Sequence, residues 1–245
     1  NVKQVYKGGK LVAENGKMLH QKEKNTDWST EIKERVFHSF HRVPITVEEL
    51  QLKETTGTHQ RVIDMVAHEL ITKERIEEWK ELPGVAPGVD ISRDIVKLAA
   101  IERHKNTGHV GLGFLGKYGL KKGAVATSIG HDSHNLVIAG VTDEDMVLAG
   151  NRVIENGGGL AIALEGKVLA DLPLPIGGLM ADEPVEVVDE KLEHMKKLSV
   201  ELGISEDIDA FMTLAFISLP VIPKLRLNTY GVVDVEKHQV VEARF

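Results

Sequence analysis

The segment 123–141 constrains the fold of this chain more than any other part of the sequence. Two apolar runs, 123–129 and 136–141, consist mainly of small or β-branched residues and are bounded by glycines. Runs of this length and composition are typical of buried strands. Between them lie five consecutive polar residues: His131, Asp132, Ser133, His134 and Asn135. The pattern predicts a strand–turn–strand unit that displays a polar turn, residues 130–135, at one edge of a sheet.

The polar turn places two imidazoles beside a carboxylate. Histidine titrates near neutrality, with an ordinary pKa of about 6.5, so His131 and His134 next to Asp132 favour proton transfer. The alternative is a surface turn, because Asp, Ser and Asn favour turns through local hydrogen bonds. Imidazole and carboxylate also suit Zn²⁺, Mn²⁺ or Fe²⁺, but no third ligand lies nearby in the sequence. Ser133 is a poor nucleophile candidate, because adjacent residues rarely reach one another in triad geometry.

The overall composition excludes several classes of protein. The 245 residues carry a net charge of −7 and lack a basic run with interleaved aromatic residues, which argues against nucleic-acid binding. No apolar stretch approaches the roughly 18 residues that span a bilayer, so no membrane association is expected. The absence of cysteine excludes disulfides and thiolate metal sites. We expect no signal peptide and a cytoplasmic location.

The N-terminal half combines a β-ribbon with a mixed segment. Residues 2–19 alternate around two glycine-containing turn dipeptides, which predicts a small β-meander. Such a ribbon is marginal alone, so we expect its partner sheet upstream of this chain. Further elements are predicted as helices at 30–36 and 72–79, the second capped by Thr72, an extended segment beginning at 47–50, and a strand at 60–66.

The C-terminal half predicts a mixed sheet with flanking helices. A central strand is expected at 95–104, and its polar end, 102–105, either faces the same edge as the polar turn or is a solvated strand terminus. The glycines of 108–119 lack the setting of a dinucleotide site and the ending of a P-loop, so they indicate flexible or close-packed backbone. The remaining predictions are a helix after Thr142, a hairpin over 160–172, helices from Pro184 and Ala210, and closing strands at 224–227 and 232–235. The fold class is therefore α/β or α+β.

Several segments resemble one known family. They are Glu102-Arg103-His104 with Thr107-Gly108, the glycine-rich stretch 111–119, the run 126–135 that contains the polar turn, Leu172-Pro173-Leu174-Pro175-Ile176-Gly177-Gly178-Leu179-Met180, and the segments 211–214 and 219–223. In this order they resemble the C-terminal part of adenine deaminase, an amidohydrolase, over nearly the whole chain. The resemblance implies that residues 1–22 end a small β-domain and that residues 23–245 form the C-terminal α/β domain.

The resemblance implies a hydrolase that converts adenine and water to hypoxanthine and ammonia. It places the metal ligands, including a His-x-His pair, on an upstream (β/α)8 barrel, and no His-x-His occurs in this chain. We therefore expect a divalent metal, manganese or iron, in the full-length enzyme and none in this chain. The expected partners are adenine, the missing N-terminal barrel and further copies in a homo-oligomer.

Our hypothesis for the site divides seven residues between two roles. The proton-transfer group is His131, Asp132 and His134, and the substrate-binding group is Ser133, Asn135, Glu102 and Arg103. The alternative is a noncatalytic folding or oligomerisation module in which the polar turn is purely structural.

Overall fold

A computed structural model describes residues 2–19, 28–52 and 56–245 of the chain. The chain divides into two compact units, Asn1–Glu34 and Arg35–Phe245. The domain boundary expected between residues 22 and 23 lies outside the described residues.

The first unit contains a three-stranded antiparallel ribbon. Its strands are β1 (Gln4–Lys7), β2 (Lys10–Glu14) and β3 (Lys17–Met18). The turns between them include residues with positive φ at the two predicted dipeptides, 8–9 and 15–16. The β-meander prediction is confirmed, and no residue of the three strands is buried. The predicted helix at 30–36 is α1 (Thr30–Phe37), which likewise carries no buried residue.

The second unit is built on an eight-stranded mixed sheet with the order β11-β10-β8-β9-β6-β7-β4-β5. In chain order these strands are β4 (His59–Met65), β5 (Thr72–Glu78), β6 (Ile95–Ile101), β7 (Val110–Gly116), β8 (Ala124–Thr127), β9 (Leu136–Gly140), β10 (Gly159–Leu164) and β11 (Lys167–Pro173). All neighbouring pairs are antiparallel except β4 with β7, which is parallel. This confirms the expected mixed sheet and the α/β fold class.

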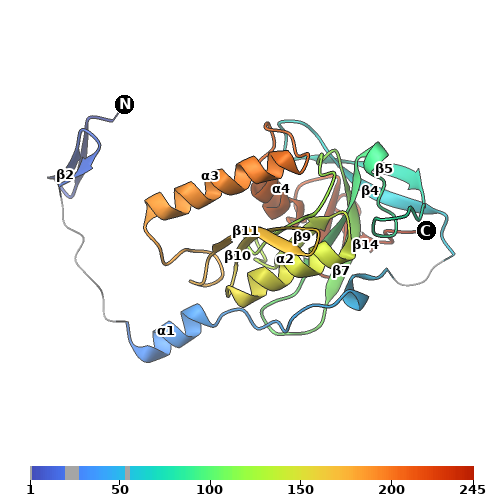
Figure 1. Ribbon diagram of the computed structural model, residues 1–245, viewed down its shortest axis with the longest axis horizontal. Helices are drawn as coiled ribbons and strands as arrows, with labels where there is room; N and C mark the ends of the chain where they lie inside the picture. Colours follow the sequence, from blue (N-terminus) through green and yellow to red (C-terminus); the bar gives the residue numbers. More distant parts are fainter. Residues whose placement is uncertain (1, 20–27, 53–55) are drawn as a thin grey trace. The chain divides into compact units, whose positions relative to one another are not determined.

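Helices cover both faces of this sheet (Figure 1). On one face lies α2 (Asp143–Glu155); on the other lie α3 (Val185–Glu201), α4 (Ala210–Ile217) and a small sheet of β12 (Leu225–Asn228), β13 (Gly231–Asp234) and β14 (Gln239–Val241). Successive strand residues point to opposite faces, and β6 shows both: Leu98 packs in the core beneath α3 and α4, and Ala99 packs beneath α2. No helix in the described ranges is long and apolar enough to cross a membrane.

The start of α2 shows how the sequence fixes this layer. Thr142 is the N-cap, and its hydroxyl accepts a hydrogen bond from the Asp145 backbone at 3.3 Å, as predicted. The Asp145 carboxylate accepts hydrogen bonds from the backbones of Glu165 and Gly166, at 3.2 and 3.1 Å. The Asp145 side chain therefore connects the β10–β11 turn to the first turn of α2.

The glycine-rich stretch is the strand β7, packed directly against another backbone. A Cβ added at Gly111 would lie 1.9 Å from the carbonyl oxygen of Asn228. At Gly113 the nearest atom would be a methyl group of Val232, at 3.0 Å. The β12–β13 hairpin can approach β7 this closely only because both side chains are missing, so the close-packed interpretation is confirmed.

The predicted helix at 72–79 is wrong, because this segment is the edge strand β5. Its Glu, Lys and Arg residues favour helices, but each of its seven residues pairs with β4. Charged residues are tolerated at a sheet edge, where one side of the strand stays in water. Thr72 caps no helix; its hydroxyl donates to the Leu225 carbonyl at 2.8 Å and so joins β5 to β12.

Two smaller predictions also differ from the structure. The segment at 47–50 begins no strand; Glu48–Leu50 forms a 3₁₀ turn, η1, in which the side chain of Leu50 is fully buried in the core beneath α2. The closing strands at 224–227 and 232–235 are present, but the third strand, β14, was not predicted, since it is short and mostly exposed.

Candidate functional site

The polar turn lies at the end of the sheet where β8 stops and β9 begins. Three other segments reach the same place: the loop after β6, the C-terminal end of α4, and the loop after β11. The polar end of the predicted strand at 95–104 therefore does share an edge with the polar turn. All four segments belong to the unit Arg35–Phe245.

Arg103 is the residue that ties these segments together. Its side chain donates hydrogen bonds to three backbone carbonyls: His134 at 2.5 Å, Gly177 at 3.0 Å and Ser39 at 3.5 Å. Its guanidinium also lies over the Phe40 ring, 4.9 Å from the centroid. Arg103 is only 1% exposed, and burial lowers its pKa to about 10. Within the described chain no carboxylate forms an ion pair with it, so carbonyl dipoles stabilise this charge.

Glu102 and His104 fix the loop on either side of Arg103. The Glu102 carboxylate accepts hydrogen bonds from the backbones of His104, Lys105 and Thr107 and from the Thr107 hydroxyl, at 2.6–3.0 Å. Burial opposes ionisation, but these donors lower the pKa of Glu102 to about 2. The ring Nε2 of His104 lies 2.7 Å from the Ser133 carbonyl oxygen. His104 therefore gives the loop a second contact with the backbone of the polar turn, beside that of Arg103.

His131 is held by its backbone and presents its ring to solvent. Its N–H donates to the Ala215 carbonyl at 2.8 Å, and its carbonyl accepts from the Ser218 hydroxyl at 3.2 Å. The ring stacks on Phe216 with 5.1 Å between centroids, and the side chain is 43% exposed. Its Nδ1 lies 2.9 Å from a carboxylate oxygen of Asp132, which is itself 83% exposed.

His134 is partly buried, like His131. Its ring centroid is 6.1 Å from that of His131, and its buried Nδ1 has no hydrogen-bond partner in the described chain. Burial, together with the neighbouring His131 and Arg103, lowers the pKa of His134 below its ordinary value of 6.5. A neutral imidazole at neutral pH, with an unused ring nitrogen, is able to accept a proton.

The structure brings all seven residues of the sequence hypothesis to one edge. Asn135 points its side-chain oxygen at the backbone N–H of Arg103, at 3.3 Å, and Ser133 is exposed at the tip of the turn. The groups differ in availability, however. The side chains of Glu102 and Arg103 are engaged within the protein, whereas those of His131, Asp132 and Ser133 face solvent.

Sequence reasoning missed Ser128, which is fully buried beneath the turn. Its hydroxyl donates to the Gly178 carbonyl at 2.6 Å and accepts from the backbone of Gly159 at 2.7 Å. It therefore joins the end of β8 to β10 and to the loop after β11. The signal was a hydroxyl residue directly after an apolar strand, since a buried hydroxyl needs partners.

The polar turn does not form a metal site by itself. The part of the chain that the structure describes holds no group of three or more His, Asp or Glu side chains placed to bind a metal ion. His131 and His134 supply two imidazoles and Asp132 binds His131, which leaves no closed ligand set. The residues of the polar turn therefore do not fit a metal ion.

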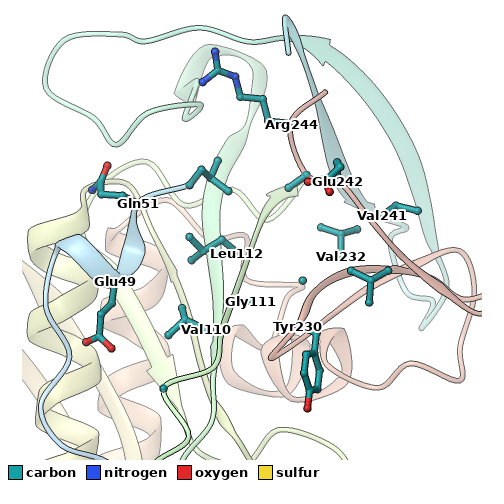
Figure 2. A pocket seen from close by; sticks show the side chains of 15 residues that line it. Glu49, Gln51, Val110, Gly111, Leu112, Tyr230, Val232, Val241, Glu242 and Arg244 are labelled. Atoms are coloured by element: carbon teal, nitrogen blue, oxygen red, sulfur yellow. The ribbon is translucent and has the colours of Figure 1, made fainter. Parts of the chain in front are cut away.

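An open cavity of the described chain lies away from the polar turn. It has a volume of about 650 Å³ and is an open groove between β7 and the strands β13 and β14 (Figure 2). Glu49 and Gln51 lie on one side of it, and Tyr230 and Val241 on the other. No residue of 130–135 contributes to its lining. Cavity size alone therefore does not identify the site, whose evidence is the titratable cluster.

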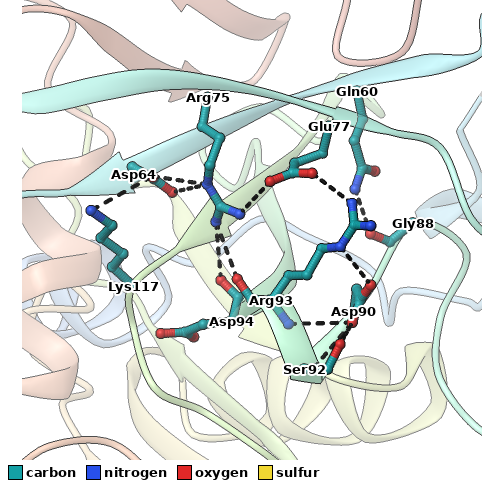
Figure 3. Close-up of polar contacts among 10 residues, drawn as sticks. All are labelled: Gln60, Asp64, Arg75, Glu77, Gly88, Asp90, Ser92, Arg93, Asp94 and Lys117. Carbon is teal, nitrogen blue, oxygen red and sulfur yellow. Dashed lines mark hydrogen bonds and ion pairs between the residues drawn. The ribbon is translucent and has the colours of Figure 1, made fainter.

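A second polar cluster, on β4, β5 and the 3₁₀ turn η2 (Ile91–Arg93), is an ion network (Figure 3). The Arg75 side chain donates to both oxygens of Asp64, at 3.0 and 2.9 Å, and to Glu77 at 2.9 Å. Arg93 donates to the other oxygen of Glu77 at 2.6 Å. Each of these carboxylates has a cationic partner, so the network stabilises the edge of the sheet and offers no reactive group.

Comparison with known proteins identifies relatives of this chain. The family model described as "Adenine deaminase C-terminal domain" matches residues 69–239. "Adenine deaminase 2" of Carboxydothermus hydrogenoformans is 43% identical over 240 residues, which cover 98% of this chain and 40% of that protein. "Adenine deaminase" of Petrotoga mobilis is 41% identical over 235 residues, 96% of this chain and 40% of that protein. The chain thus spans about 40% of the length of these curated relatives.

Proposed function

This chain belongs to the adenine deaminase C-terminal domain family, and we propose that it forms the C-terminal domain of a longer hydrolase that converts adenine and water to hypoxanthine and ammonia. Two observations support the proposal: the family match over residues 69–239 and the names of the relatives, which align with this chain over 40% of their length. The cell would use such an enzyme in purine salvage and adenine catabolism. We place it in the cytoplasm.

The His131–Asp132 pair is the main observation that supports a role for this domain in the reaction. Nδ1 of His131 is held 2.9 Å from the Asp132 carboxylate, and the ring is fixed by stacking on Phe216. A carboxylate at Nδ1 fixes the orientation and the tautomer of an imidazole. With Nδ1–H donated to Asp132, Nε2 is the nitrogen that can take up and release a proton.

Deamination at C6 requires a proton to move from the attacking water to the departing amino group. We assign this transfer to His131, with Asp132 as its positioning residue. His134 is the second candidate, because its lowered pKa keeps the ring neutral and its ring lies 6.1 Å from that of His131. General acid–base assistance of this kind contributes about 10²- to 10⁴-fold to a rate.

The contacts of the four proposed substrate-binding residues support two different roles. Ser133 and Asn135 remain proposed contacts to adenine, through a hydroxyl and a side-chain amide. The four donors on Glu102 and the three carbonyls on Arg103 support a positioning role for these two residues instead. They hold the backbone of the polar turn in place.

We further propose that a divalent metal, manganese or iron, is held by the upstream barrel and activates water there. The barrel, adenine and further copies of the enzyme in a homo-oligomer are the proposed partners. A noncatalytic role for the polar turn is the second candidate function. The observation that favours it is the backbone of the turn, which hydrogen bonds from Arg103 and His104 hold in place.

The proposed function is tested by joining this chain to its upstream sequence. Ammonia release and hypoxanthine formation from adenine are measured after loading with manganese or iron, for the joined protein and for residues 1–245 alone. We expect activity only in the joined protein. Activity of residues 1–245 alone, or an inactive joined protein that is folded and metal-loaded, would contradict the proposal.

A further inference from the structure

A small pocket lies beside the polar turn, between α4, the end of β4 and β12. Its volume is about 190 Å³, and its walls are apolar: Met65, Leu70, Ile71, Met212, Phe216 and Ile217. Three of these side chains form an exposed rim, with Leu70 53%, Ile71 39% and Met212 43% exposed. Drug-sized ligands occupy pockets of about 300–1,000 Å³, so this one suits a smaller molecule.

The pocket is connected to the polar turn through one aromatic ring. Phe216 lines the pocket and also stacks on His131, with 5.1 Å between ring centroids. A flat heteroaromatic ligand in the pocket would have an aromatic wall to stack on. The pocket and the proposed proton-transfer group therefore share a wall.

Arg226 also lines the pocket, and it is a buried cation without an acidic partner. Its guanidinium donates to the carbonyls of Leu225, at 3.0 Å, and Leu70, while Nε has no partner in the described chain. No carboxylate of the described residues forms an ion pair with it, and burial lowers its pKa to about 10. Two of the five N–H groups of the guanidinium are thus engaged. The side chain is fully buried at the wall of the pocket, so a ligand that reaches it must supply acceptor atoms to the N–H groups that remain.

A second charged residue restricts the ligand to a neutral molecule. Glu69 lines the pocket and is exposed. A carboxylate there repels phosphate and other anions and can accept a hydrogen bond from a ligand N–H. The pocket therefore combines a fork of donors, one acceptor, an aromatic wall and apolar sides.

We propose that this pocket binds a 6-oxopurine, the product class of the proposed reaction. Hypoxanthine presents O6 and N7 side by side as acceptors, the edge to which arginine donates two parallel hydrogen bonds in guanine. Its N1–H would donate a hydrogen bond to the Glu69 carboxylate. Adenine carries an amino group in place of O6, so a donor would face the donors of Arg226. The pocket selects product over substrate and would retain hypoxanthine beside the site where it forms.

This inference rests on the proposed function for the identity of the ligand, but its test does not require catalysis. Binding of hypoxanthine, adenine and inorganic phosphate to purified residues 1–245 is measured by isothermal titration calorimetry. We expect hypoxanthine to bind at one site per chain, adenine about tenfold more weakly or worse, and phosphate not at all. Equal binding of adenine and hypoxanthine, or binding of phosphate in their place, would overturn the proposal.

Two variants locate the site. Arg226→Met removes the donor fork, and Met212→Trp fills the pocket from its exposed rim and leaves Arg226 intact. Both should abolish hypoxanthine binding, whereas Arg152→Met, a half-exposed arginine on α2, should leave it unchanged. If Arg226→Met fails to fold, as judged by circular dichroism, Met212→Trp decides. Undiminished binding in Met212→Trp would place hypoxanthine elsewhere and refute the pocket, while ammonia release by the joined protein would separately uphold the proposed function.

Discussion

The side-chain Nε of Arg103 donates a hydrogen bond to the backbone carbonyl of His134, at 2.5 Å. This contact joins the end of β6 to the polar turn between β8 and β9. The same guanidinium reaches Gly177, so one buried cation positions three loops. The turn is therefore held by its backbone, which leaves the side chains of His131 and Asp132 free for chemistry.

Two adjacent glycines provide a matched test of the packing around Arg103. Both Gly177 and Gly178 have positive φ, 68° and 75°, so alanine strains the backbone similarly at each. Only at Gly178 would the new Cβ meet Arg103, 2.6 Å from Nη1; at Gly177 it would meet nothing within 4 Å. We expect Gly178→Ala to lower the free energy of unfolding by about 2 kcal/mol more than Gly177→Ala, because carbonyls bonded to Arg103 lose their donor. Urea denaturation measures the difference, and equal losses would refute the role of Arg103.

Glu102 should make the stability of the unit depend on pH. Its pKa is about 2 in the folded protein, against 4.5 ordinarily. A depressed pKa means that the ionised carboxylate stabilises the fold above pH 4.5, and that this contribution is lost as the pH falls toward 2. Glu102→Gln should therefore lose about 1–3 kcal/mol at pH 7 and approach the parent protein in acid. Parallel stability curves of the two proteins between pH 7 and pH 3 would contradict this assignment.

Lys97 and Asp143 form a buried ion pair at the start of α2. The two side chains are 1% and 6% exposed, with 2.7 Å between Nζ and Oδ1, and Gln51 donates to the other Asp143 oxygen at 2.9 Å. Burial lowers the pKa of Lys97, although Asp143 opposes this. Lys97→Met should cost about 3–5 kcal/mol, because it leaves a carboxylate buried and unpaired.

A double-mutant cycle separates this pair from ordinary packing. Lys97→Met combined with Asp143→Asn should cost clearly less than the sum of the two single changes, because no uncompensated charge remains. Chemical denaturation of the four proteins gives the coupling free energy. Additive losses would show that the charges do not stabilise one another.

Residues 1–245 alone should hold no tightly bound metal, because the sequence lacks cysteine and the polar turn offers no closed ligand set. Elemental analysis after gel filtration in the presence of manganese or iron should find well below one ion per chain. One metal ion per chain that is lost in the His131→Gln and His134→Gln variants would make these residues ligands.

The sequence predicted the sheet best where local and global signals agree. The apolar runs of β8 and β9 are buried on both faces, so their composition and their place in the fold both indicate buried strands. It failed at β5, where charged residues with helix propensity pair with β4 at the edge of the sheet. Tertiary pairing overrode local propensity there, and a single sequence does not display its pairing partner.

Part of the candidate site could also be predicted from the sequence. His131, Asp132 and His134 are contiguous, so their proximity followed from the sequence. The proposed 6-oxopurine pocket did not, because Met65, Phe216 and Arg226 lie on three elements that the fold alone brings together. The contacts of Arg103 to three loops were invisible for the same reason.

The His134 ring offers a signature in the pH dependence of activity. Its pKa is lowered, so the ring stays neutral and able to accept a proton down to a pH below 6.5. If His134 is the base, the acid limb of kcat/KM in the joined protein should fall below pH 6.5 and disappear in His134→Gln. An acid limb that persists unchanged in that variant would leave His131 as the proton carrier.

The central claim, that the polar turn takes part in deamination, is tested most directly by steady-state kinetics of His131→Gln and His134→Gln in the joined, metal-loaded protein. His194→Gln, an exposed histidine on α3, is the control. We predict that at least one of the two variants loses about 10²- to 10⁴-fold in kcat, with metal content and melting temperature retained. Near-normal kcat in both variants, with only the melting temperature lowered, would contradict the claim and make the turn structural.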